Sequence, residues 1–156
     1  MSNTITFKKV NEPYGWLSNM SAHPIEEDNI LYPTAEHYFQ SLRFEDKDLV
    51  KQICSIRSPM GAKMKVKTLK DHFKIFPRSP KDVENMSKTL DKKIEQHPFL
   101  KLYLKELKDF FIMEDVTNRP NASGLFWGMA FINNKWIGSN HLGNIWMNKI
   151  KENNFE

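Results

Sequence analysis

Cysteine is nearly absent from this sequence, which limits the chemistry open to the chain. Cys54 is the single cysteine among 156 residues, so an internal disulfide and a cysteine-rich zinc site are both excluded. Cys54 lies in the apolar-patterned segment 49–54, where a buried small hydrophobe is the ordinary interpretation. His37, His97 and His141 lack the spacing of metal ligands. We therefore expect no metal site and no other cofactor.

Long apolar runs are also missing. No stretch approaches the length of a membrane span, and residues 1–9 lack an apolar signal core. We therefore expect a soluble, cytoplasmic protein without a membrane partner; the sequence says nothing of protein partners or oligomeric state. Repeats, low-complexity segments and linker-like shifts in composition are absent as well. The length then predicts one domain over residues 1–156.

The charge balance is mildly basic. The formal net charge is +4 and the pI is about 9.1, which favours phosphorylated or nucleic-acid ligands. A DNA-binding domain usually concentrates Lys and Arg in a stripe. The densest basic stretch, residues 63–74, mixes lysines with apolar residues. A solvated helix face over a buried stripe is the simpler interpretation, and a phosphate-attracting rim is the alternative.

Start signals and periodicity predict a predominantly α protein with a few short β-strands, of the α+β class. Ser or Thr before Pro or an apolar-periodic run marks several helix starts. Helices are expected over residues 34–44, 46–55, 58–72, 98–107 and 140–151, and another starts at residue 79 with helical spacing through residue 94. Short strands are expected within residues 4–10, 24–32 (a pair turning at 27–29), 111–114, 125–129 and 134–137.

Four separated sequence blocks carry a family resemblance. Tyr14–Asn19 resembles a G-F-L-S-N-F segment, and Tyr32–Gln40 resembles W-P-T-S-E-H-Y-F-Q. Ser58–Ala62 resembles S-P-M-x-A, and Trp127-Gly128 with Gly138–Gly143 resembles W-G followed by G-x-N-x-L-G. The blocks occur in family order and span roughly residues 5–150. On these motifs the chain is identified as a member of the NADAR (YbiA-like) N-glycosidase family.

The resemblance implies a mainly helical, compact domain and N-glycosidase chemistry. Relatives act on phosphoribosylamino-pyrimidine intermediates of riboflavin synthesis or remove ADP-ribose from guanine in DNA. The implied substrate is therefore a nucleotide-like small molecule or ADP-ribosylated DNA, and the sequence does not choose between them. Breaking an N-glycosidic bond builds positive charge on the sugar, which needs an anion beside it or a base for water.

Glu36 is the natural candidate for that anion, although an acidic residue in the first helical turn also complements the helix dipole. His37 is a candidate proton donor or ligand contact, with a core-edge histidine as the alternative. Lys93 lies in a block resembling K-F-x-Q-H-P. Covalent catalysis by lysine needs a lowered pKa, normally from burial, and a charged helix face is the simpler interpretation.

Further candidates would bind the substrate. Trp127 would stack on the leaving base or pack in the core, and Gly128 would let the ligand approach the backbone. Asn140 would cap a helix or share that cap with ligand hydroxyls or phosphate. Ser18 and Asn19 would contact ribose or stabilise a turn.

Arg57 would clamp a phosphate, and Trp16 would line the pocket or pack in the core. The chain departs from the family at Arg43, where relatives commonly carry a lysine, and at residues 123–126, where many carry an aspartate. Guanidinium stays protonated, so Arg43 cannot act as an amine nucleophile, but it can hold a phosphate or orient Glu36. A binding module for ADP-ribose-like ligands without turnover is therefore the main alternative function, and a general nucleic-acid binder is a third.

Overall fold

The computed structural model describes residues 3–153 and 155. Over these residues the chain forms seven α-helices, two 3-10 helices and three two-stranded sheets. The predicted class, predominantly α with short strands, is confirmed. Two compact units are present: one combines the chain up to Ser18 with the chain from Pro98 onward, and the other is the continuous stretch Asn19–His97. Among the described helices, none is long and apolar enough to cross a membrane.

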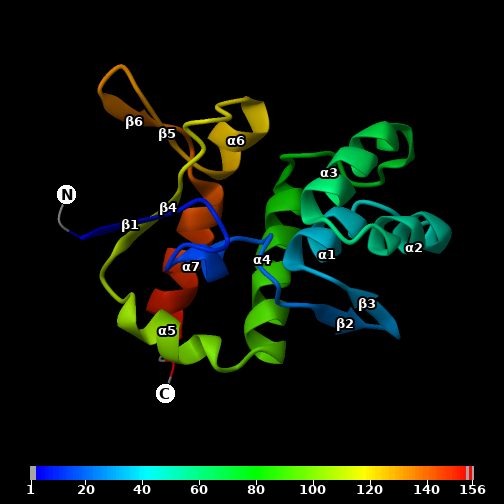
Figure 1. The fold of residues 1–156 in the computed structure, drawn as a ribbon, viewed down its shortest axis with the longest axis horizontal. Coiled ribbons are helices and arrows are strands. Elements are labelled where there is room, and N and C mark those ends of the chain that lie inside the picture. The colour runs from blue at the N-terminus through cyan, green and yellow to red at the C-terminus, as the bar shows by residue number, and fades with distance from the viewer. Residues whose placement is uncertain (1–2, 154, 156) are drawn as a thin grey trace. The chain divides into compact units, whose positions relative to one another are not determined.

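The continuous unit contains four helices and one hairpin. Its elements are β2 (Ile25–Glu27), β3 (Ile30–Tyr32), α1 (Ala35–Ser41), α2 (Lys47–Ser55), α3 (Pro59–Thr68), a 3-10 turn (Lys70–His72) and α4 (Pro80–Gln96). In Figure 1, α1 lies beside both α3 and α4, and the same helix contacts α2. The α1 helix is thus the central element of this unit, and it carries Glu36.

Side-chain caps start all four helices of this unit. Thr34, Asp46, Ser58 and Ser79 each accept a hydrogen bond from a backbone N–H two or three residues further on. Such a cap satisfies one of the unpaired donors of a helix start. These four starts were predicted from sequence and are confirmed. The helix predicted over 58–72 is shorter than expected, since α3 ends at Thr68 and a 3-10 turn follows.

The predicted hairpin over residues 24–32 is also confirmed. β2 and β3 pair antiparallel with Ile25 opposite Tyr32. Asp28 and Asn29 make the turn with φ values of 52° and 64°. Two left-handed residues in a two-residue loop match the right-handed twist of a hairpin, and Asp and Asn tolerate this region well.

The other unit joins the start of the chain to its last third. Its elements are β1 (Thr4–Phe7), a 3-10 turn (Gly15–Leu17), α5 (Leu100–Glu106), β4 (Phe111–Glu114), α6 (Ala122–Trp127), β5 (Ala130–Ile132), β6 (Lys135–Ile137) and α7 (His141–Glu152). β1 pairs in parallel with β4, and α7 packs against β4 (Figure 1). Trp146, fully buried on α7, donates its indole N–H to the carbonyl of Leu17 at 3.1 Å.

Two sequence predictions fail in this unit. The strand expected over 125–129 is wrong, because α6 occupies Ala122–Trp127 and the strand begins only at Ala130. The physical reason is local: the Asn121 side chain accepts a hydrogen bond from the Gly124 N–H at 2.7 Å and starts a helix in what reads as an apolar strand. The helix expected from residue 98 begins later, at Leu100.

Gly143 gives a test of the packing between α7 and β4. A Cβ at Gly143 would collide with the carbonyl oxygen of Ile112 on β4. We expect Gly143→Ala to lower the free energy of unfolding by about 2–3 kcal/mol, the range for overpacking against an atom that cannot move. Gly61→Ala is the matched control near the start of α3, since its added Cβ would meet the movable Ile56 Cγ2 at 3.0 Å. Urea denaturation of both variants checks this; equal losses would contradict it.

Candidate functional site

Glu36 is held in one position by main-chain and side-chain contacts. It lies in the first turn of α1 with only 8% of its surface exposed. Its backbone N–H donates to the carbonyl of Asn19 at 2.9 Å. Gln40, one turn further along α1, donates from Nε2 to Glu36 Oε2 at 2.6 Å. The Glu36 carboxylate is therefore held in one orientation and is largely shielded from solvent.

Arg43 supports that carboxylate from behind through Gln40. Its Nη1 donates to Gln40 Oε1 at 2.8 Å, while Nε and Nη2 bind the two oxygens of Asp82 at 3.0 and 2.8 Å. The guanidinium also lies over the rings of Phe39 and Phe73, at 4.9 and 5.6 Å from their centroids. Such a bidentate, stacked arginine is geometrically locked. Of the two roles suggested for Arg43, orienting Glu36 fits this geometry better than holding a phosphate.

Asn19 presents a buried acceptor that has no hydrogen-bond partner among the described residues. Its Nδ2 donates to the sulfur of Met86 at 3.0 Å, whereas Oδ1 has none. A buried polar atom without a partner costs about 1–3 kcal/mol. Because the backbone oxygen of Asn19 also holds the N–H of Glu36, this acceptor is tied to the candidate carboxylate. It suits a ligand hydroxyl, which was the contact expected of Asn19.

Lys93 is fully buried in the last turn of α4. Its Nζ donates to Ser21 Oγ at 2.8 Å. Burial lowers the pKa of the Lys93 ammonium from 10.5 to about 7. The simpler interpretation of Lys93 as part of an exposed charged face is therefore wrong. The buried polar residues of α4 follow one helical face: Asp82, Asn85, Thr89 and Lys93.

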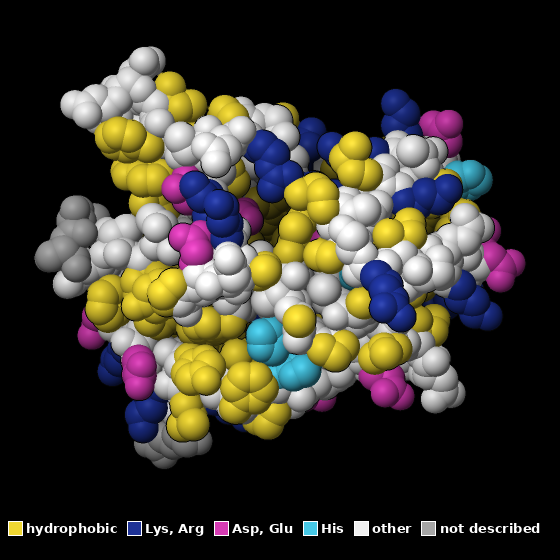
Figure 2. All heavy atoms as spheres, viewed as in Figure 1, with side chains coloured by type: hydrophobic (Ala, Val, Ile, Leu, Met, Phe, Trp, Pro, Cys, Tyr) yellow, Lys and Arg dark blue, Asp and Glu magenta, His cyan; other side chains and the backbone are white. Residues whose placement is uncertain are grey.

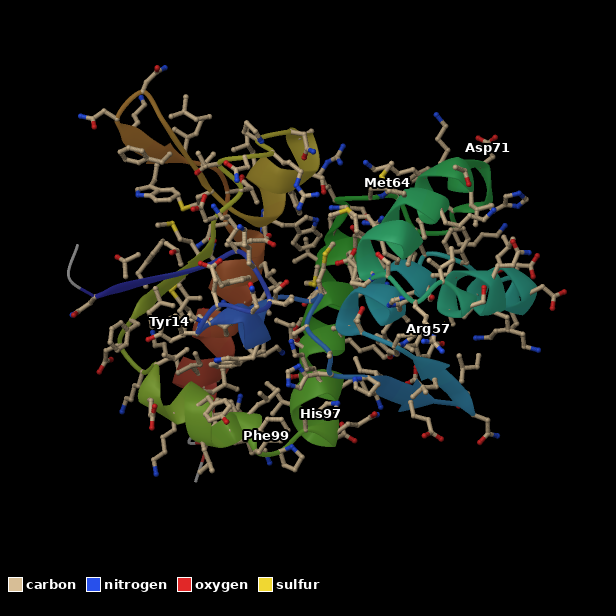
Figure 3. All side chains as sticks on the ribbon, in the orientation of Figure 1. Tyr14, Arg57, Met64, Asp71, His97 and Phe99 are labelled. Atoms are coloured by element: carbon tan, nitrogen blue, oxygen red, sulfur yellow. The ribbon has the colours of Figure 1, made fainter. Side chains whose placement is uncertain are left out.

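His37 and Arg57 differ strongly in exposure. His37 is buried, with Nδ1 at 2.8 Å from Thr34 Oγ1 and Nε2 at 2.6 Å from the Ile56 carbonyl. Desolvation lowers its pKa. With both ring nitrogens engaged, His37 ties the start of α1 to the end of α2, as a core histidine does. Arg57 is exposed in the segment between α2 and α3 (Figure 3), where a phosphate can reach it.

The remaining predicted residues belong to the discontinuous unit. Trp127 ends α6 and is only 7% exposed, with its ring perpendicular to those of Phe126 and His141. A Cβ at Gly128 would lie 2.6 Å from the Glu114 carbonyl. Gly128 is therefore explained by the close approach of β4. Trp127, expected at a strand end, instead sits at the end of a helix among other aromatic rings.

Asn140 precedes α7 in a left-handed conformation, with φ of 53°, and its side chain makes no capping bond. The simple capping interpretation is therefore wrong. Instead Nδ2 donates to the carbonyl of Ile112 at 3.0 Å, and Oδ1 is buried without a hydrogen-bond partner. Asn140 thus presents a second unmatched acceptor. Ser18 is buried at the end of the first 3-10 turn.

Trp16 lines a hollow in the surface of its unit. The hollow has a volume of about 410 Å³. Trp16 contacts Tyr103 with 5.5 Å between ring centroids. The lining residues are Pro13, Tyr14, Trp16, Tyr103, Glu106, Leu107 and Phe110. The ring of Trp16 also meets the buried Trp146 edge-on, so it packs against the core of its unit as well as lining this hollow. Its contact with a substrate stays a prediction.

Metal binding finds no support in the described part of the chain. No group of three or more His, Cys, Asp or Glu side chains is placed there to hold an ion. In the view of Figure 2, Lys and Arg side chains lie scattered over the surface and do not form a stripe.

Comparison with known proteins places these residues in a family. The model of the NADAR domain matches residues 6–152. N-glycosidase YbiA of Shigella flexneri is 32% identical over 143 residues, covering 92% of this chain and 84% of the relative. The NMR structure of Escherichia coli YbiA superposes with a TM-score of 0.72 at 29% identity, covering 97% of this chain and 86% of that one. A riboflavin biosynthesis protein, PYRR of Zea mays, is 26% identical over 94% of this chain but only 24% of its own length.

The chain therefore belongs to the NADAR family. Sequence reasoning named Glu36, Arg43 and Lys93 as candidates but did not predict their hydrogen-bond partners. The contacts of Gln40 could have been predicted, because it follows Glu36 by four residues and precedes Arg43 by three, and side chains at these spacings meet on a helix. Asp82 and Ser21 carried no local signal, because they lie 39 and 72 residues from Arg43 and Lys93.

Proposed function

We propose that this protein is an N-glycosidase that hydrolyses the bond between a base and a ribose, with Glu36 as its catalytic carboxylate. The observation that carries the proposal is the fixed, nearly buried Glu36 carboxylate, oriented by Gln40 and backed by the Arg43–Asp82 pair. The names of the relatives support the reaction class. The match to the family model spans both compact units, which supports treating residues 1–156 as one functional domain.

Glu36 would act on the sugar. As the base departs, positive charge builds on the ribose ring, and a carboxylate held nearby stabilises it or removes a proton from the attacking water. Burial strengthens this effect because the surroundings have a low dielectric constant. Gln40 leaves Glu36 Oε1 available for this task by binding the other oxygen.

Lys93 would protonate the leaving base. An amine with a pKa of about 7 is close to half protonated at neutral pH, the range in which a general acid works best. Arg43 cannot share this role, since its guanidinium keeps its protons and is bound to Asp82. In the unit that carries Glu36, Asn19 and Arg57 would contribute to binding ribose and phosphate. In the other unit, Asn140 and Trp16 stay predicted substrate contacts.

Two substrates fit this chemistry: ADP-ribosyl-guanine in DNA, and the phosphoribosylamino-pyrimidine of riboflavin synthesis. Binding of ADP-ribose-like ligands without turnover is the second candidate. The observation that favours it is Arg43 itself, which occupies a position where relatives commonly have lysine and which is committed to an ion pair. One experiment separates these three possibilities: turnover of the first substrate, turnover of the second, and binding without turnover.

The test offers each substrate separately and measures released base by chromatography. We expect the wild type to turn over one substrate and Glu36→Gln to lose at least about 100-fold in kcat, in line with the loss of one group that stabilises the transition state. Glu36→Gln keeps a hydrogen-bonding side chain beside Gln40, so folding and ligand binding should persist. Glu45→Gln, an exposed glutamate in the same unit, is the control and should retain full activity.

Three other results would contradict the proposed role of Glu36 or favour a different function. Turnover that survives in Glu36→Gln would remove Glu36 from the mechanism. If no product forms from either substrate while ADP-ribose raises the melting temperature of the wild type, the binding module is correct. Retention on DNA that depends on salt and is unaffected by ligand would instead indicate a general nucleic-acid binder.

A further inference from the structure

Ser21 connects the buried amine of Lys93 to a histidine at the surface. Lys93 Nζ donates to Ser21 Oγ at 2.8 Å, and Ser21 Oγ lies 2.7 Å from His23 Nδ1. Lys93 is fully buried and Ser21 is 4% exposed, whereas His23 is only partly buried. The three side chains thus form a continuous hydrogen-bonded path from the interior of the Asn19–His97 unit to solvent.

The hydrogen bonds have a definite direction. Because the Lys93 ammonium donates to Ser21 Oγ, the hydroxyl proton of Ser21 is free to point at His23. His23 can accept it at Nδ1 only if its imidazole is neutral. Burial, followed by the charges of Lys93 and His97, lowers the pKa of His23 to about 4, so the ring is neutral near pH 7 and serves as the acceptor.

The ring of His97 packs against that of His23. His97, at the end of α4 (Figure 3), stands edge-on to His23 with 5.1 Å between ring centroids, and its own Nε2 lies 2.7 Å from the Pro24 carbonyl. α1 and β2 pack against α4 and bring further ionisable groups. These are Glu36, His37 and Tyr38 on α1 and Glu26 and Glu27 on β2. Glu27 is bound by Lys92 and Tyr38.

We propose that Ser21 and His23 form a proton relay between Lys93 and solvent. The inference rests on the proposed function, in which Lys93 protonates the leaving base. When Lys93 Nζ gives its proton to the base nitrogen, the amine is left neutral. The neutral Nζ can now accept a hydrogen bond from Ser21, and the two hydrogen bonds reverse, so that Ser21 Oγ accepts from the Nδ1–H tautomer of His23. A proton then passes from water to His23 Nε2 as Nδ1 gives its proton to Ser21 Oγ and Ser21 gives its own proton to Lys93 Nζ. The hydroxide left behind is neutralised by the proton that Glu36 takes from the attacking water, so each turnover consumes one water and no net proton.

The relay has a direct test that does not need a substrate. Near pH 5.5, between the pKa values of about 7 for Lys93 and about 4 for His23, the ammonium is protonated and the imidazole is neutral. NMR of the ¹⁵N-lysine-labelled protein measures how fast the Lys93 ammonium protons exchange with water. We expect Ser21→Ala to slow this exchange at least tenfold and His23→Phe to slow it by a similar factor.

Three further variants serve as controls for the exchange measurement. Ser21→Thr keeps the hydroxyl and should exchange like the wild type. Ser55→Ala and His72→Phe alter exposed residues of the same unit and should leave the Lys93 exchange unchanged. Exchange in Ser21→Ala as fast as in the wild type would overturn the relay, and so would slow exchange in Ser21→Thr.

Activity gives the second readout. In a dilute, non-imidazole buffer, His23→Ala should lower kcat about tenfold, and added imidazole should restore it, since a small base can enter the space and carry the proton. A purely structural role of His23 would give a loss that imidazole does not repair. If exchange slows as expected but the wild type turns over neither substrate, the relay stands and the proposed function fails. If turnover occurs but exchange is unaffected, the relay alone fails.

Discussion

Replacing Lys93 with Met is expected to stabilise the protein by about 2–4 kcal/mol near pH 7 while abolishing turnover. The wild-type ammonium is fully buried, and its pKa falls from 10.5 to about 7. One unit of pKa shift corresponds to about 1.4 kcal/mol, so the shift corresponds to about 5 kcal/mol. Met has a similar length and no charge, and the loss of the bond to Ser21 offsets part of the gain. Stability sacrificed at an active site is a common trade-off.

The stability gained from Lys93→Met should decrease as the pH rises. Between about pH 7 and pH 10.5, the unfolded chain holds a proton on Lys93 that the folded protein does not bind. Wild-type stability therefore rises with pH across this window. The advantage of Lys93→Met is fully present below about pH 7 and should shrink steadily towards pH 9.5. Urea denaturation at about pH 7 and 9.5 measures the difference.

Lys92→Met is the matched control. Lys92 is the neighbouring residue, is partly exposed and pairs with Glu27 at 3.5 Å. Exposed pairs of this kind contribute about 0–1 kcal/mol, so this variant should change stability little. If the gain from Lys93→Met were the same at both pH values, Lys93 would not carry a lowered pKa in the folded protein.

Replacing Arg43 with Ala is expected to lower the free energy of unfolding by about 3–5 kcal/mol, the usual result of leaving one member of a buried ion pair alone. Asp82 is fully buried and would lose both bonds from the guanidinium, keeping the backbone N–H of Arg78 at 2.8 Å. The aromatic rings of Phe39 and Phe73 would also lose their packing against the cation. Thermal or urea denaturation gives the loss.

A double variant separates packing from charge. Arg43→Met combined with Asp82→Leu replaces both partners by apolar side chains and should recover most of the lost stability, as buried ion pairs often do. Activity should not return with it, because Gln40 no longer receives a bond from Arg43 and Glu36 loses its support. Recovery of both properties would show that Arg43 does not position Glu36.

Local chemistry explains which parts of the fold were predictable. The cap at Thr34 and the turn at Asp28-Asn29 are decided by hydrogen bonds and φ preferences within three residues, so sequence is sufficient. The segment 125–129 failed for the same kind of reason, because the local cap at Asn121 was outweighed by an apolar run that resembles a strand. The burial of Lys93 was not predictable, since it depends on elements packed around α4.

In the candidate site, too, residues in local motifs could be predicted from sequence, whereas partners from distant parts of the chain could not. Glu36 was identified because a motif carries it, and its partner Gln40 lies on the same helix. The partners that define Arg43 and Lys93 come from distant parts of the chain, and no spacing rule connects Arg43 with Asp82. Asn140 was read as a cap from its position between two glycines, yet its side chain bonds to Ile112 on β4, 28 residues away.

The parallel pairing of β1 with β4 also has a consequence for synthesis on the ribosome. Thr4 pairs with Phe111, so the first strand emerges more than a hundred residues before its partner exists. The stretch Asn19–His97 is complete much earlier and contains its own hairpin, caps and core. Contacts close in sequence form fastest, and distant pairings form last. During translation, β1 therefore stays without its partner strand until residues 111–114 have been made, and a pause after residue 97 would prolong that interval.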